Sequence, residues 1–199
     1  MVPQPVSVSA FDNSAPACEW REIADLFVEC FSAAPYFEDR GELATIIEWG
    51  PTMLAGNGRL VTARSNGALV GFALAHSLAN DVPWQKTLAQ LGDHASSSEA
   101  LAAPHDAFVI HELAVRDSER GRGIARACML ELLNTRAESH TFLGTYERAV
   151  AARSMYQRWG FELVGQVPMR GDAIALHVLT SRTPAAVERL SASSSAARA

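Results

Sequence analysis

Cysteine, long hydrophobic runs and positive charge are all scarce in this sequence of 199 residues. The three cysteines, Cys18, Cys30 and Cys128, are widely spaced and form no CxxC pair, which argues against a disulfide framework and a zinc knuckle. No apolar run approaches the roughly 18 residues that a membrane span needs. The N-terminal MVPQPVSVSAFDN lacks the basic segment and apolar core of a secretory signal. These absences predict a reducing, cytoplasmic location and no membrane contact.

The charge balance and the composition narrow the class of protein further. Acidic residues outnumber basic ones by 22 to 17, and the net charge of −5 argues against a nucleic-acid binder. Hydrophobic residues make up 48% and charged residues 20%, as in folded globular proteins, so a largely disordered chain is excluded. We expect a leader over 1–13, one domain over 14–183 and a flexible Ala/Ser-rich tail over 184–199.

The hydrophobic pattern alternates between helical and extended periods along the chain. Apolar residues at helical spacing predict helices over 17–33, 43–47, 85–91, 125–139 and 149–159. Extended runs predict strands over 59–64, 68–75, 107–115, 141–145, 161–167 and 173–180. Asn66-Gly67, between the first two strands, is a strong hairpin signal. This alternation predicts an α/β fold with a mixed sheet and helices on its faces.

The least regular segment is 78–106, which we expect to be largely a loop. It carries four acidic residues against the single base Lys86: Asp81, Asp93, Glu99 and Asp106. An acidic wall favours a cationic substrate such as a polyamine, an aminoglycoside or an amino sugar. An ordinary solvated loop explains the same composition. Trp84, Tyr36 and Phe37 either line a pocket or belong to the core.

The segment Glu112–Leu133 joins a strand to a helix through a glycine turn. The first turn of a helix has unpaired N–H groups and a positive dipole end, and glycines let an anion approach that backbone. Arg120 and Arg122 add charged donors, so the turn suits a phosphate or pyrophosphate. The pattern lacks the Gly-Lys-Ser/Thr of a P-loop and the third glycine of a dinucleotide fingerprint. A purely structural turn is the alternative.

A second segment, 147–161, reads ERAVAARSMYQRWGF. Together the two segments resemble the GNAT superfamily of N-acetyltransferases. Arg120 through Ala125 is similar to that family's acetyl-CoA motif Q/R-x-x-G-x-G/A, and Leu113-Ala114-Val115 to its L-x-V strand end. Ala152 through Phe161 is similar to A-x-x-L-Y-x-x-x-G-F, with Met155 in place of Leu. The element order resembles the family over about 17–180, and the motifs are sharp over 107–167.

The resemblance implies a fold, a reaction and a cosubstrate. The fold is α/β (α+β), with a central mixed, mostly antiparallel sheet of about six to seven strands and about four flanking helices, splayed at the acetyl-CoA site. The reaction is direct transfer of an acetyl group from acetyl-CoA to a primary amine in a ternary complex, with no metal. In such an enzyme the pantetheine arm lies along Leu113, Ala114 and Val115. The pyrophosphate is bound by the turn and the helix start: Arg120, Gly121, Arg122, Gly123, Ile124 and Ala125.

Two residues are candidates for proton transfer. The resemblance makes Tyr156 the general acid that protonates the departing CoA thiolate, with a packed core aromatic as the alternative. Glu112 is the first choice for the general base, and His111 is the second. Each residue also has a purely structural interpretation. Glu112 can be a hydrogen-bonded carboxylate, and His111 can be a strand histidine whose hydrogen bonds are satisfied within the fold. Ala149 stands where the family often has an Asn that holds the cofactor arm, so this chain lacks the side chain that makes this contact.

The acceptor is the least constrained part of the interpretation. We expect a cationic small-molecule amine. The first alternative is an amine of a protein or peptide, which needs a groove between loops that the 78–106 segment would block. The second is a non-catalytic acyl-CoA-binding module, with which the absence of the Asn at position 149 is consistent. The family resemblance is compatible with a homodimer, although no clear interface stands out in the sequence.

Overall fold

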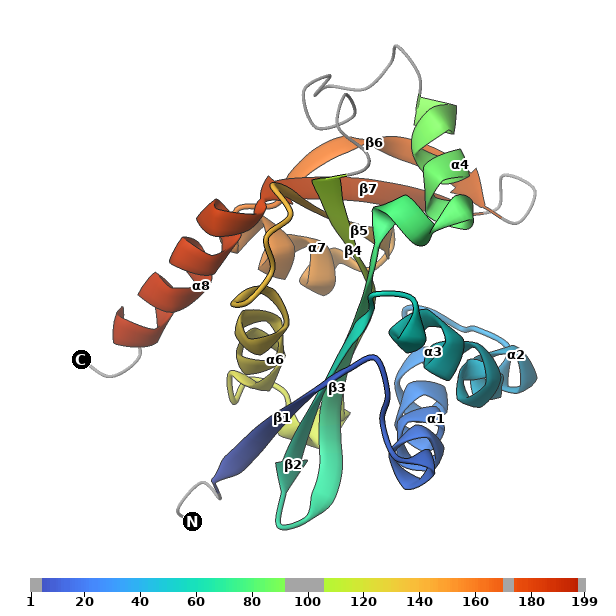
Figure 1. Ribbon diagram of the computed structural model, residues 1–199, viewed down its shortest axis with the longest axis vertical. Helices are drawn as coiled ribbons and strands as arrows, with labels where there is room; N and C mark the ends of the chain where they lie inside the picture. Colours follow the sequence, from blue (N-terminus) through green and yellow to red (C-terminus); the bar gives the residue numbers. More distant parts are fainter. Residues whose placement is uncertain (1–4, 92–105, 170–173, 197–199) are drawn as a thin grey trace. The chain divides into compact units, whose positions relative to one another are not determined.

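A seven-stranded sheet organises the computed structural model, which describes residues 5–91, 106–169 and 174–196 (Figure 1). The strand order is β1-β2-β3-β4-β5-β7-β6. The strands are β1 (Val6–Asp12), β2 (Arg59–Ser65), β3 (Ala68–Ser77), β4 (Ala107–Val115), β5 (His140–Tyr146), β6 (Glu162–Met169) and β7 (Ile174–Arg182). β4 and β5 are parallel, whereas the pairs β1–β2, β2–β3, β5–β7 and β6–β7 are antiparallel. The predicted mixed, mostly antiparallel sheet is confirmed.

The described residues contain seven α-helices. They are α1 (Ala17–Phe31), α2 (Arg40–Ala44), α3 (Ile46–Ala55), α4 (Val82–Leu91), α6 (Ile124–Leu133), α7 (Val150–Arg158) and α8 (Thr183–Ala196). Single 3-10 turns, η1 (Leu78–Asn80) and η4 (Asp117–Glu119), precede α4 and α6. The number exceeds the about four helices that the family resemblance implies, because the region after α1 holds two helices and because α4, predicted over 85–91, and α8 add to them.

The chain divides into two compact units. The first consists of Met1–His76 and His111–Thr135, and the second of Ser77–Ile110 and Arg136–Ala199. The boundary falls within β3 and β4, so each unit contains part of both strands.

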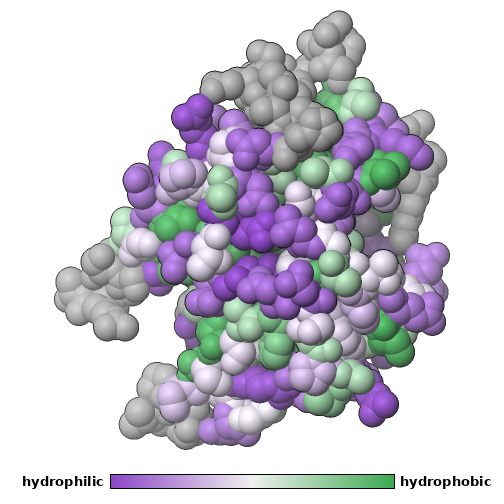
Figure 2. Space-filling view, in the orientation of Figure 1, coloured by the Kyte–Doolittle hydropathy of each residue, from purple (hydrophilic) through white to green (hydrophobic). Residues whose placement is uncertain are grey.

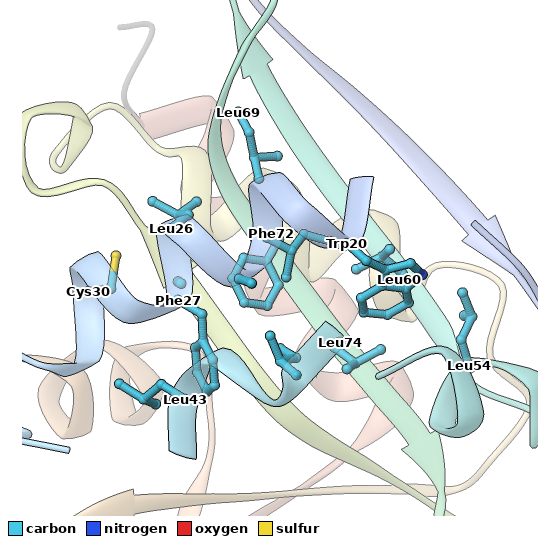
Figure 3. Packing of buried hydrophobic residues seen from close by; sticks show 14 residues of the cluster. Trp20, Leu26, Phe27, Cys30, Leu43, Leu54, Leu60, Leu69, Phe72 and Leu74 are labelled. Carbon is cyan, nitrogen blue, oxygen red and sulfur yellow. The ribbon is translucent and has the colours of Figure 1, made fainter. Parts of the chain in front are cut away.

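The core of the first unit lies between α1, α3 and the strands β2 and β3. Trp20, Ile23, Phe27 and Cys30 recur at helical spacing and are all buried, as the sequence pattern predicts. The rings of Phe27 and Phe72, both labelled in Figure 3, have centroids 6.0 Å apart. Figure 3 labels the following members of this cluster: Trp20, Leu26, Phe27, Cys30, Leu43, Leu54, Leu60, Leu69, Phe72 and Leu74.

The predicted hairpin between β2 and β3 is present. Asn66 and Gly67 both have positive φ, 52° and 81°, and connect the paired residues Ser65 and Ala68. Positive φ at both central residues is the requirement of a type I′ turn, and Asn-Gly meets it at low cost.

The N-terminal residues differ from the expected leader, because Val6–Asp12 form β1 and pair antiparallel with β2. Side chains along Val6–Ala10 alternate between half-buried and exposed. The sequence VSVSA has the period-two pattern of an edge strand. The alternation was therefore present in the sequence and indicated a strand.

The second unit has its own core between α4 and part of the sheet. Leu88 and Leu91 are buried with Val109 of β4 and Val164 of β6, and Trp84 packs against the same cluster. A helix over 85–91 is thus confirmed within the segment expected to be largely a loop. Residues 92–105, which include Asp93 and Glu99, lie outside the described residues.

The C-terminal segment, expected to be a flexible tail, is helical through Ala196. Ala186 and Leu190 are four residues apart and fully buried. The Thr183 hydroxyl, at the start of α8, lies 2.9 Å from the Thr141 hydroxyl of β5. Burial of this apolar stripe stabilises the helix despite its Ser-rich composition.

Among the residues that the structure describes, few large apolar side chains are exposed. They lie on separate segments of the chain: Phe37, Ile47, Val82, Val150 and Leu163. On the face shown in Figure 2, hydrophobic residues form small groups among hydrophilic ones. Among the helices that the structure describes, none has the length and hydrophobicity of a membrane span.

Candidate active site

The glycine turn between β4 and α6 is set by backbone conformation. Gly121 and Gly123 both have φ of 76°, in the left-handed region that favours glycine. A Cβ at either position would meet nothing within 4 Å, so conformation and not space requires glycine there. Gly123 is the N-cap of α6 and offers no side chain to cap it. The first helical N–H groups of α6, beginning at Ile124, therefore lack an intrahelical acceptor and can bind an anion.

The two arginines of the turn are already engaged in ion pairs. The Arg120 guanidinium lies 2.8 Å from the Asp117 carboxylate, and Arg122 pairs with Glu119, both within one turn. Arg120 Nε also donates to the Val115 carbonyl at 3.3 Å. These pairs orient both guanidinium groups at the turn. An incoming anion would share the arginines with these carboxylates.

Gly71 of β3 allows the turn to pack closely against the strands of the first unit. A Cβ at this position would lie 2.9 Å from Ile124 Cγ2 and 3.1 Å from the Ala114 carbonyl oxygen. Any side chain here would displace the start of α6 or the end of β4. The sequence analysis did not identify Gly71, although an isolated glycine within a strand pattern signals close backbone approach.

The strand end that resembles a pantetheine-binding segment is held from two sides. Ala114 is buried, and Leu113 and Val115 are half-buried. The Cys30 thiol of α1 donates to the Val115 carbonyl at 3.5 Å, the same oxygen that Arg120 contacts. Burial raises the pKa of Cys30 to about 11, so the thiol stays protonated as a donor.

Glu112, the predicted base, lies in β4 in a poorly solvated environment. Burial, and after it the negative charge of Glu38, raise its pKa from 4.5 to about 8. A carboxylate with this pKa can accept a proton near neutral pH. Glu38 follows α1 in the chain, and the sequence analysis did not identify it.

Tyr36, at the same end of the first unit, was considered only as an apolar residue. Its ring packs on Phe31 with centroids 4.5 Å apart. Burial raises the pKa of the Tyr36 hydroxyl, the charge of Arg120 opposes that rise, and Glu112 adds to it. Arg120 and Glu112 are therefore both within electrostatic reach of Tyr36, although they are far from it in the sequence.

His111, the second candidate base, is half-buried and faces another histidine. Its ring centroid lies 6.5 Å from that of His76 in β3. Imidazole side chains are common ligands of metal ions. The expected absence of a metal therefore stays a prediction.

Tyr156, the predicted acid, belongs to α7 in the second unit. Only 7% of the residue is exposed, and its ring packs edge-to-face on Trp159 and Phe161 at 5.8 and 5.9 Å. Gly160, with φ of 86°, ends the helix, and the Phe161 N–H donates to the Tyr156 carbonyl at 3.0 Å. The Gly-Phe pair of the motif thus fixes the C-terminal turn that carries Tyr156.

Ala149 is the N-cap of α7 and is 2% exposed. It provides no side-chain hydrogen bond to the helix or to a ligand. The family contact expected from an Asn here is replaced by a small buried methyl group.

Comparisons with known proteins agree with this geometry. The family model described as "Acetyltransferase (GNAT) family" matches residues 20–161. No curated protein sequence matches the chain.

Three solved structures illustrate the likeness of the fold. Protein PH1933 of Pyrococcus horikoshii OT3 has a TM-score of 0.64 at 15% identity, covering 89% of this chain and 98% of its own. An N-acetyltransferase of Staphylococcus aureus Mu50 has a TM-score of 0.62 at 16% identity, covering 90% and 99%. The ribosomal-protein-S18-alanine N-acetyltransferase of Escherichia coli has a TM-score of 0.59 at 12% identity, covering 90% and 94%. At these identities the likeness shows the fold alone.

Proposed function

Because the chain belongs to the acetyltransferase (GNAT) family, we propose that it transfers an acetyl group from acetyl-CoA to a primary amine of a cationic small molecule. The observation that carries this proposal is the left-handed Gly121-x-Gly123 turn, which leaves the first N–H groups of α6 free of intrahelical acceptors. The pyrophosphate of CoA is the anion that such a site would bind in this family. Arg120 and Arg122 would assist it.

The proposed reaction has three proton transfers around one acyl transfer. Glu112 accepts the proton that the acceptor ammonium must lose before attack. The neutral amine then attacks the thioester carbonyl carbon, a C–N bond forms, and the C–S bond breaks to release CoA thiolate. Tyr156 gives its phenolic proton to the thiolate, and the second proton that the nitrogen loses as it becomes an amide nitrogen returns to the Tyr156 phenolate. A backbone N–H along Leu113–Val115 would polarise the carbonyl as an oxyanion hole does.

The two acidic residues of the 78–106 segment that the structure describes, Asp81 and Asp106, give little support for a cationic substrate. Asp81 is buried and accepts a hydrogen bond from the Trp84 N–H at 3.0 Å, which caps α4. Asp106 accepts one from the Ser139 N–H at 3.2 Å. Both carboxylates stabilise local structure. Support for a cationic acceptor comes instead from Glu112 in the first unit, whose carboxylate can accept the proton of an ammonium group.

A thermal-shift titration with acetyl-CoA tests the cosubstrate, with CoA, ATP and NAD as comparisons. A ligand at about 100 times its Kd stabilises a fold by roughly 2.7 kcal/mol, which is about 5–10 °C for a chain of this length. We expect a shift of the melting temperature with acetyl-CoA and CoA. The shift should be lost in Gly123→Asp, because the new carboxylate would repel the pyrophosphate and because φ of 76° is strained for any residue other than glycine. A folded protein that responds to neither would refute the cosubstrate.

Mass spectrometry of an amine panel against a peptide panel then tests the acceptor. Acetylation of small alkylamines supports the proposal, whereas acetylation of peptides alone would assign the enzyme to protein substrates. CoA binding without transfer to any amine would favour a non-catalytic acyl-CoA-binding module.

A further inference from the structure

Left-handed backbone conformation occurs in this chain almost entirely at glycine and asparagine. Within the described residues, four glycines and four other residues have φ between 52° and 86°. The glycines are Gly67, Gly121, Gly123 and Gly160, and three of the other residues are Asn13, Asn57 and Asn66. Glycine has no Cβ, and asparagine tolerates this conformation better than most side chains do. The remaining position is Phe37, with φ of 54°, where a bulky side chain makes the conformation unfavourable.

Phe37 is also the most exposed of the large apolar residues that the structure describes. It is 65% exposed, and the four others, all aliphatic, are between 42% and 59% exposed. Packing of this mostly exposed ring therefore does not explain why phenylalanine stands at a position that suits glycine or asparagine. Backbone conformations that break a local rule in this way are concentrated at functional sites.

The loop between α1 and α2 holds Phe37 in this conformation. The N–H groups of Tyr36 and Phe37 both donate to the Ala33 carbonyl at 3.0 Å. The Glu38 N–H donates to the Phe31 carbonyl at the end of α1, also at 3.0 Å. The Tyr36 ring packs on the Phe31 ring, with centroids 4.5 Å apart. Both neighbours of Phe37 are therefore anchored to the end of α1, which fixes the backbone that carries the exposed ring.

The end of α1 lies against the strand end of β4 within the first unit. The thiol of Cys30 donates to the Val115 carbonyl at 3.5 Å. Phe31, which follows Cys30, is the residue that holds the Glu38 N–H. These hydrogen bonds connect the loop around Phe37 to the segment that resembles a pantetheine-binding strand end. An acceptor that attacks the thioester must reach this strand end, which the loop borders.

We propose that Phe37 is a specificity residue of acetyl transfer, whose ring binds the cationic amine acceptor. This inference rests on the proposed function. The face of an aromatic ring attracts an ammonium group, and the ring also covers the hydrocarbon chain that carries it. Leucine at this position would supply the second contact alone, and asparagine would supply neither. Alkylamines that are protonated in water are thereby selected over neutral arylamines.

The test compares Phe37→Asn and Phe37→Leu with Ile47→Asn, a matched control that removes an exposed apolar side chain of α3 in the same unit. In Phe37→Asn we expect the KM for an alkylamine to rise about fivefold, as for loss of a partly exposed cation–π contact. Phe37→Leu should show most of this rise, and Phe37→Trp should keep the wild-type KM. The KM for acetyl-CoA should stay unchanged in every variant, and Ile47→Asn should behave as wild type.

Urea unfolding separates this role from a packing role. The urea midpoint of Phe37→Asn should equal or exceed that of the wild type, because asparagine adopts φ of 54° at lower cost than phenylalanine. A packing role predicts the opposite pair of results, a lower midpoint and an unchanged acceptor KM.

The outcomes distinguish this inference from the function beneath it. If wild type acetylates amines and Phe37→Asn keeps the acceptor KM, the inference is overturned and the function stands. A wild-type KM in Phe37→Leu would likewise overturn the role of the aromatic ring. If wild type acetylates no amine, the proposed function fails and this inference fails with it.

Discussion

Replacing Glu112 by Gln should stabilise the protein in alkaline solution and leave its stability at acidic pH almost unchanged. Gln has the shape of protonated Glu and no charge, so the variant mimics the form that the folded protein prefers. The pKa of Glu112 is raised from 4.5 to about 8 by burial and by Glu38. The folded state therefore holds this proton more tightly than the unfolded chain between these two values.

The sign and the size of the effect follow from proton linkage. Because the native state binds more protons in this window, the free energy of unfolding of the wild type falls as pH rises from about 4.5 to 8. Each unit of pKa difference corresponds to about 1.36 kcal/mol, which gives an upper limit of about 4 kcal/mol between pH 5 and pH 9. Glu112 is half-buried, and partial solvation reduces this to about 2–4 kcal/mol.

Urea unfolding of both proteins at intervals from pH 5 to pH 9 measures this difference. We expect the two free energies of unfolding to agree within about 0.5 kcal/mol at pH 5 and to diverge by about 2–4 kcal/mol at pH 9. The melting temperatures at pH 9 should then differ by about 4–15 °C. Glu48→Gln, which removes an exposed carboxylate of α3 in the same unit, controls for the general loss of a negative charge. If Glu112→Gln tracks the wild type across the whole range, Glu112 is not perturbed, and its assignment as a base near neutral pH would be withdrawn.

Two further substitutions test the acid and the core. Tyr156→Phe should lower kcat about 100-fold, which is the effect of removing a general acid, and should leave acetyl-CoA binding unchanged. If turnover is unaltered, the role of Tyr156 is limited to its packing on Trp159 and Phe161. Gly50→Ala should lower the free energy of unfolding by about 1–2 kcal/mol, because its Cβ would lie 2.3 Å from Trp20 Cζ3 and the clash exceeds the gain in helix propensity. Urea unfolding at pH 7 measures this loss, and a more stable variant would contradict the close packing of Trp20.

Local signals in the sequence predicted local structure well. The spacing of Trp20, Ile23 and Phe27 identified α1 and its buried face. Asn66-Gly67 identified the β2–β3 hairpin, because only a few residue pairs adopt positive φ at both positions. The turn at Gly121 and Gly123 has the left-handed conformation that a glycine-rich start of a helix implies.

Elements whose stability depends on distant partners were harder to predict. β1 is a short edge strand whose pairing with β2 spans the whole of α1, α2 and α3, so its alternation of Val and Ser carried little weight alone. α8 is rich in Ser and Ala, and burial of Ala186 and Leu190 gives it tertiary support that no propensity scale records. Asp81 and Asp106 looked like part of an acidic surface, yet both accept hydrogen bonds from backbone N–H groups.

The same distinction applies within the candidate site. A motif with fixed spacing identifies groups that one segment supplies, such as the turn N–H donors and the Tyr156 position at the end of α7. The pKa of Glu112 depends on burial and on Glu38. Glu38 belongs to the loop between α1 and α2, which precedes β2 and β3 in the sequence. The Val115 carbonyl likewise receives Cys30 from α1 and Arg120 from the turn. The electrostatic character of a site arises from tertiary contacts of this kind, so a sequence motif can identify the reaction class, whereas the environment of each side chain depends on residues that lie outside every motif.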